Sequence, residues 1–147
     1  MTTTGRLRAD ERRTEVLEEL VDLFLAEGFA HASVADLAAR LRCSKSTLYL
    51  LAPSKEQIVV SAVRHYFRRA ADRVEARVAE CADAAQRLTA YLGAVSDELR
   101  PASAAFREDL AAYAPAAAVY RDNTTFAARR VQQLVADGVA AGGPPPP

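Results

Sequence analysis

The residues with the clearest chemical potential form one short run at positions 44–49, Ser-Lys-Ser-Thr-Leu-Tyr. Hydroxyl and ammonium groups donate hydrogen bonds to phosphate oxygens and to the edges of bases. Ser44 can accept a hydrogen bond from a free amide of a first helical turn, which predicts that a short helix begins here. Leu48 and Leu51 then form the apolar back of this helix. A short helix with an apolar back and a polar front is suited to entering the major groove of DNA.

A second short helix is predicted just before this run. Ser33 is its N-cap and Asp36 lies at the third helical position, an arrangement typical of a capping box. Val34, Leu37 and Leu41 recur at helical spacing and give it one apolar face. Because isolated helices this short are unstable in water, the pair needs a longer helix to pack against. Two short helices joined by a tight turn and braced by a longer one make a helix-turn-helix.

Longer helices are predicted on both sides of the pair. The first begins near Asp10 and runs to Glu27, and Gly28 is expected to end it in a left-handed conformation. Another begins after Ser54 and runs to about Glu80. Since nothing reads as a strand and 32 of the 147 residues are Ala, the predicted fold class is all-α. The remaining helices are expected over residues 84–100, 102–113 and 116–141.

Composition and charge exclude several classes of protein. The chain balances 19 basic against 19 acidic residues, and 50% hydrophobic with 26% charged residues indicates a soluble globular protein. Its longest uncharged stretch, residues 110–120, is too short to cross a bilayer. The N-terminal arginines are not followed by the apolar segment of a secretory signal. Cys43 and Cys81 suggest no disulfide framework, so we expect a cytoplasmic protein without membrane contact.

Four segments in register closely resemble the TetR (tetracycline-repressor-like) family of bacterial transcription regulators. They are 24–29 (Phe-Leu-Ala-Glu-Gly-Phe), 32–38 (Ala-Ser-Val-Ala-Asp-Leu-Ala), 44–49 and 53–56 (Pro-Ser-Lys-Glu). The resemblance covers about residues 10–70. It implies a three-helix N-terminal domain that binds double-stranded operator DNA. It also implies C-terminal helices that form a homodimer and bind a small-molecule effector. By the same resemblance the protein is a repressor, and binding of the effector releases it from the DNA.

The same resemblance assigns roles to individual residues. The start of the second short helix corresponds to the operator-contacting positions of the family, and Ser33 and Lys55 correspond to phosphate contacts. Arg42 borders the turn and adds electrostatic attraction to DNA, as do the N-terminal arginines. Tyr49 as a packing residue remains an alternative. The predicted DNA-binding residues are Ser33, Arg42, Ser44, Lys45, Ser46, Thr47, Tyr49 and Lys55.

Three departures from the family pattern bear on function. Arg42 holds a turn position that is often Gly, which predicts a strained φ costing about 1 kcal/mol. Residues 50–52, Leu-Leu-Ala, are smaller and less polar than is common in the family, so binding to DNA is expected to be weaker or slightly shifted. The family usually carries two more helices after the one predicted over 116–141, so the dimerisation region is expected to be truncated.

The predicted organisation has four parts. A flexible basic arm over 1–9 precedes a helix-turn-helix domain over 10–54. A helical regulatory and dimerisation domain follows over 55–141, and residues 142–147 form a Gly/Pro tail. Aromatic residues of the C-terminal helices could line a ligand pocket, although their helical spacing explains them equally well as core. These residues are Tyr91, Phe106, Tyr113, Tyr120 and Phe126.

Other functions have less support in the sequence. We find no nucleophile–base arrangement, Gly-rich phosphate loop or pair of carboxylates, so neither enzymatic activity nor a cofactor is expected. The histidines and cysteines lack the spacing of metal ligands, so no metal site is expected. Residues 33–51 could instead be an ordinary helical hairpin. The alternatives to a regulator are a shortened helical interaction protein that does not bind DNA and a small-ligand-binding module.

Overall fold

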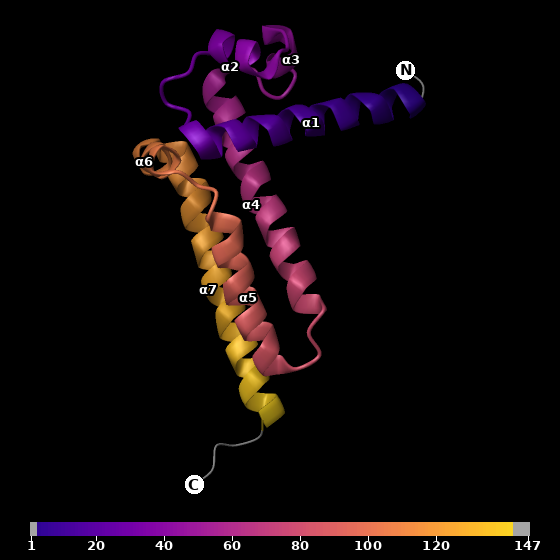
Figure 1. Ribbon diagram of the computed structural model, residues 1–147, viewed down its shortest axis with the longest axis vertical. Helices are drawn as coiled ribbons and strands as arrows, with labels where there is room; N and C mark the ends of the chain where they lie inside the picture. Colours follow the sequence, from indigo (N-terminus) through magenta and orange to yellow (C-terminus); the bar gives the residue numbers. More distant parts are fainter. Residues whose placement is uncertain (1–2, 143–147) are drawn as a thin grey trace. The chain divides into compact units, whose positions relative to one another are not determined.

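Seven α-helices make up the structure, a computed structural model that describes residues 3–142 (Figure 1). No strand occurs within this range, so the predicted all-α fold class is confirmed. Every predicted helix is present, with differences at the ends. The helices are α1 (Thr3–Glu27), α2 (Val34–Leu41), α3 (Lys45–Tyr49), α4 (Lys55–Ala79), α5 (Ala84–Leu99), α6 (Ala104–Ala112) and α7 (Ala114–Gly142).

The largest difference from the predicted boundaries is at the N-terminus. α1 begins at Thr3 and not near Asp10, so residues 3–9, expected to be a flexible arm, are helical. Arg, Leu and Ala in this stretch have high helix propensity, and the stretch contains no proline. The prediction missed them because it followed the apolar stripe, which begins only further along the helix.

The C-terminal helix also extends beyond its predicted range. α7 begins at Ala114, with Pro115 in its first turn, where a missing N–H costs no helical hydrogen bond. It ends at Gly142, the first residue of the predicted tail, and the rest of that tail lies outside the described residues. None of the helices in the described range is both long and apolar enough to cross a membrane.

The helices group into two compact units. Unit 1 comprises residues 3–66 and 102–119, and unit 2 comprises residues 67–101 and 120–142. The division falls within α4 and α7, so each of these helices contributes to both units. The division does not fall at residue 54, because both the first half of α4 and α6 group with the N-terminal helices. The extent of an independently folding DNA-binding domain stays a prediction.

Unit 1 is built on the apolar stripe of α1. Leu20, Val21 and Phe24 of this helix are almost completely buried, as are Leu37 of α2 and Leu48 of α3. The two short helices lie side by side next to α1 (Figure 1). Each short helix therefore adds a buried leucine to a core that the longer helix supplies, as their length requires.

The turn after α1 brings several aromatic rings together. Gly28 has φ 79°, as predicted for the residue that ends the helix, and its N–H donates to the Phe24 carbonyl at 2.7 Å. The Phe29 ring then packs against Phe24, with ring centres 5.6 Å apart. Phe106 of α6 meets Phe29 edge-on at 6.1 Å and Tyr66 of α4 at 6.0 Å. This aromatic cluster fixes α6 within unit 1.

Unit 2 joins α5 to the second half of α4 and most of α7. Ion pairs connect its helices: Arg77 of α4 contacts Asp97 of α5 at 2.7 Å, and Arg130 of α7 contacts Glu75 of α4 at 2.8 Å. An apolar cluster fills the space between the three helices. Its buried members are Val74, Val78, Tyr91, Ala94 and Leu134.

Candidate nucleic-acid interface

The start of α2 is fixed by the predicted capping box. The Ser33 hydroxyl accepts a hydrogen bond from the Asp36 N–H at 3.1 Å, and the Ser33 N–H donates to the Asp36 carboxylate at 3.0 Å. The backbone N–H of Ser33, and next its hydroxyl, lower the pKa of Asp36 below its usual value of 3.8. The hydroxyl of Ser33, a predicted phosphate contact, therefore already holds one helix amide while its surface stays exposed.

The turn between α2 and α3 contains the strained residue that the sequence predicted. Arg42 has φ 54° and ψ 44°, in the left-handed region. Its N–H donates to the Ala39 carbonyl at 3.3 Å, and the Cys43 N–H donates to the Ala38 carbonyl at 3.0 Å. These two bonds form a Schellman motif, which normally places glycine at the position of Arg42. The Arg42 side chain is exposed beside the turn.

α3 presents a polar outer face. The Ser44 hydroxyl caps the helix by accepting from the Thr47 N–H at 3.1 Å, and the two hydroxyl oxygens of these residues lie 2.9 Å apart. Leu48 is completely buried against the rest of unit 1. The side chains on the opposite side are exposed, and Tyr49 is 46% accessible. The exposed residues of this face are Ser44, Lys45, Ser46 and Tyr49.

The other end of α3 is held by a residue that the sequence analysis did not single out for this role. Arg13 of α1 donates from Nη1 to the Leu50 carbonyl at 2.8 Å and from Nη2 to the Leu51 carbonyl at 3.2 Å. The last carbonyls of a helix have no partner inside it, and this guanidinium supplies one. No local pattern could reveal the pairing, because 37 residues separate Arg13 from Leu50.

Two further basic residues near the turn make contacts inside unit 1. Lys55, the first residue of α4, is half-buried, and its Nζ donates to the Ala30 carbonyl at 3.3 Å. Arg40 of α2 pairs with Glu27 of α1 at 2.8 Å, which offsets the positive charge of Arg40. The structure thus brings the predicted DNA-binding residues to the helix caps and outer faces of α2, α3 and the start of α4.

Two short helices, a tight turn and a bracing α1 define the class of this region as a helix-turn-helix. Residues 16–62 match a family described as bacterial regulatory proteins, tetR family. Over this segment the chain is similar to the TetR family, and the resemblance inferred from its sequence is confirmed there.

A curated relative agrees with this assignment. The chain is 28% identical over 64 residues to a Bacillus subtilis (strain 168) protein described as an uncharacterized HTH-type transcriptional regulator, YuxN. The aligned part spans 44% of this chain and 22% of that protein. No solved structure matches the chain significantly.

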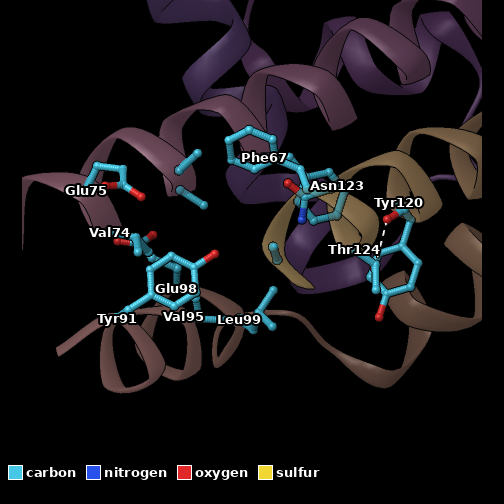
Figure 2. Close-up of a pocket in the computed structure, with 14 residues that line it drawn as sticks. Phe67, Val74, Glu75, Tyr91, Val95, Glu98, Leu99, Tyr120, Asn123 and Thr124 are labelled. Carbon is cyan, nitrogen blue, oxygen red and sulfur yellow. Dashed lines mark hydrogen bonds between the residues drawn. The ribbon is translucent and has the colours of Figure 1, made fainter. Parts of the chain in front are cut away.

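Unit 2 contains a cavity of about 220 Å³ (Figure 2). Of the five aromatic residues predicted as a ligand pocket, Tyr91, Tyr120 and Phe126 line it. Figure 2 shows Tyr91 on α5 with its hydroxyl directed into the space toward α4. Phe106 and Tyr113 do not line it, because both belong to unit 1. There, Phe106 lies in the core and Tyr113 contacts Phe29 at 6.3 Å.

The acidic groups beside this cavity are matched by guanidinium groups. Glu75 accepts two hydrogen bonds from Arg130, at 2.8 and 2.9 Å, and this pairing raises the pKa of Arg130. Glu98 lies 3.6 Å from Arg73. Burial, and next the charge of Glu75, raise the pKa of the Tyr91 phenol above 10.0, so that it stays neutral at physiological pH. The cavity thus combines apolar walls with a neutral hydroxyl and compensated charges.

Proposed function

We propose that this protein is a sequence-specific transcriptional regulator, a ligand-responsive repressor that acts in the cytoplasm as a homodimer on a palindromic operator. The observation that carries the proposal is the asymmetry of α3. Leu48 is completely buried, whereas Lys45, Ser46 and Tyr49 are exposed on the other side. A helix with a polar outer face and a buried apolar anchor is suited to entering a major groove.

In this proposal the outer face of α3 contacts bases and the helix caps contact phosphates. The long side chain of Lys45 and the small side chain of Ser46 can both donate hydrogen bonds to the edges of bases. The Tyr49 hydroxyl can donate one to a phosphate oxygen. Arg42 and Lys55 provide positive charge on either side of α3, and each phosphate that they neutralise releases counterions. Ser33 offers its exposed hydroxyl next to the free amides at the start of α2.

The homodimer follows from the size of the reading helix. α3 has five residues and reaches only a few base pairs, too few for a useful ratio of specific to nonspecific binding. Two copies related by a two-fold axis would read two half-sites about one helical turn apart, which requires a palindromic operator.

The effector is proposed to occupy the cavity of unit 2. Its aromatic and aliphatic lining favours a small, largely apolar molecule, and Asn123 and Thr124 on α7 add polar groups (Figure 2). About 220 Å³ is below the usual range for drug-sized ligands, which favours a small effector.

The test is selection of fragmented genomic DNA by the purified protein at roughly physiological salt. Enrichment of one palindromic site supports a dimeric regulator, and recovery of no site or a lone half-site contradicts it. On the selected site, we expect Lys45→Ala to weaken binding roughly tenfold and Tyr49→Phe about threefold, as lost polar contacts do. Arg121→Ala, which removes the same charge from an exposed position on α7, is the control and should leave affinity unchanged.

A further inference from the structure

The turn between α1 and α2 is held by a carboxylate from α6. Oδ2 of Asp109 accepts hydrogen bonds from the N–H of Phe29 at 2.8 Å and of Ala30 at 3.0 Å. Charge-assisted bonds of this kind are about twice as strong as neutral ones. A Cβ on Gly28 would collide with this same oxygen, so glycine is what lets the carboxylate approach. α6 thus holds the turn through two backbone amides.

Ala30 links this carboxylate to the proposed DNA contacts. While its N–H donates to Asp109, its carbonyl accepts from Nζ of Lys55 at 3.3 Å. Ser33, the N-cap of α2, follows three residues later. The positions of Lys55 and Ser33, both proposed to contact phosphates, therefore depend on one short segment whose amides bind Asp109.

We propose that Asp109 is a positioning residue for DNA binding, which fixes the segment 28–33 so that Lys55 and Ser33 reach the phosphates. This inference rests on the proposed function. Lys55 is long and flexible, and its ammonium is oriented by the Ala30 carbonyl only while that peptide is fixed. Removal of the carboxylate leaves two amides without their acceptor, and the segment with its attached lysine loses its defined position.

The experiment compares Asp109→Ala and Asp109→Asn with Glu108→Ala, an exposed neighbour on α6 that carries the same charge. In Asp109→Ala, exchange of the Phe29 and Ala30 amides should accelerate at least roughly tenfold. Affinity for the selected operator should fall about fivefold, and the slope of log K against log salt should shrink by about 0.9, the loss of one phosphate contact. Asp109→Asn keeps an acceptor oxygen and should recover part of each effect, whereas Glu108→Ala should show neither.

A purely structural role predicts a different result. Asp109→Ala would then lower the melting temperature but leave operator affinity and salt slope unchanged, which overturns the inference. Combined with Lys55→Ala, Asp109→Ala should weaken binding by clearly less than it does alone, because the contact is already missing. Failure of the wild-type protein to select any DNA overturns the proposed function. Unchanged exchange of the Phe29 and Ala30 amides in Asp109→Ala overturns the inference, whatever the wild-type protein binds.

Discussion

Both compact units have apolar cores, but the long-range polar contacts described above differ between them. In unit 1, side chains from elsewhere in the sequence bind backbone groups of short elements: Arg13 binds carbonyls at the end of α3, and Asp109 binds amides before α2. In unit 2, side chains bind one another, as in the pair of Arg130 with Glu75, and an apolar cluster fills the interior. Bonds from side chains to the backbone thus fix the position of short helices in unit 1, whereas contacts between side chains hold long helices together in unit 2.

Helix length explains this difference. A helix leaves about four N–H groups at its N-terminal end and about four C=O groups at its C-terminal end without partners, whatever its length. α2 has eight residues and α3 has five, so these unpaired groups are about half of the backbone polar groups of α2 and most of those of α3. α5 has 16 residues and satisfies most of its own backbone groups. Short helices that must be placed accurately therefore depend on individual polar side chains, whereas long helices depend on packing.

The largest expected effect tests the packing of unit 2. Leu134 is 2% exposed in the apolar cluster, and Leu134→Ala should lower the free energy of unfolding by about 2–5 kcal/mol, because it removes apolar contacts and leaves a cavity. Val135→Ala, at the adjacent 45% exposed position of α7, should change it by no more than about 0.5 kcal/mol. Urea unfolding followed by circular dichroism measures both. Equal losses would contradict the assignment of the core.

The next effect tests the close approach at the turn of unit 1. Gly28→Ala should cost about 2 kcal/mol, since alanine is strained at φ 79° and its Cβ would meet the Asp109 carboxylate and the Ala105 carbonyl oxygen, the latter at 3.2 Å. Thermal unfolding gives the difference. Gly138→Ala is the control, because nothing lies within 4 Å of a Cβ at this position of α7. There the higher helix propensity of alanine should stabilise by about 0.5–1 kcal/mol, and loss of stability in both variants would argue against this account.

A smaller effect tests the support of α3 by α1. Arg13→Ala removes two hydrogen bonds to backbone carbonyls and should lower stability by about 1 kcal/mol and weaken operator binding several-fold. Arg12→Ala removes the same charge from an exposed residue whose contact is a 3.7 Å ion pair with Glu15, and should cost little stability. Amide exchange in residues 45–51 distinguishes the two variants. Faster exchange with Arg13→Ala alone is expected, and equal exchange rates would show that α3 does not need this guanidinium.

The sequence predicted those features that depend on neighbours in the chain. Ser33, Ser44 and Gly28 mark helix ends through hydrogen bonds and backbone angles within a few residues, and the structure confirms all three. The partners of Arg13 and Asp109 could not be predicted, because chain separations of 37 and 80 residues leave no periodic signal.

The predicted pocket shows the same limit. Helical spacing identified aromatic residues on inward faces but could not tell which unit each face belongs to. Phe106 and Tyr113 therefore lie in unit 1, while Tyr91, Tyr120 and Phe126 line the cavity of unit 2.

The smallest effect separates stability from DNA binding at a single residue. Arg42→Gly relieves the strain of a non-glycine residue at φ 54° and should raise the free energy of unfolding by about 0.5–1 kcal/mol. The same change removes an exposed guanidinium beside α3, so operator affinity should fall and the salt slope should decrease by about 0.9.

Arg40→Gly provides the matched comparison, since it makes the same chemical change two residues earlier. Arg40 lies in the last turn of α2 and pairs with Glu27 at 2.8 Å, so glycine there should lower stability by about 1 kcal/mol. Opposite signs in the two variants would show that the backbone conformation, and not the loss of an arginine, decides stability at this turn. If Arg42→Gly also destabilises the protein, the Arg42 side chain contributes more to the free energy of unfolding than its strained φ costs. The presence of arginine at this position would then be explained by folding alone, without a contact to a DNA phosphate.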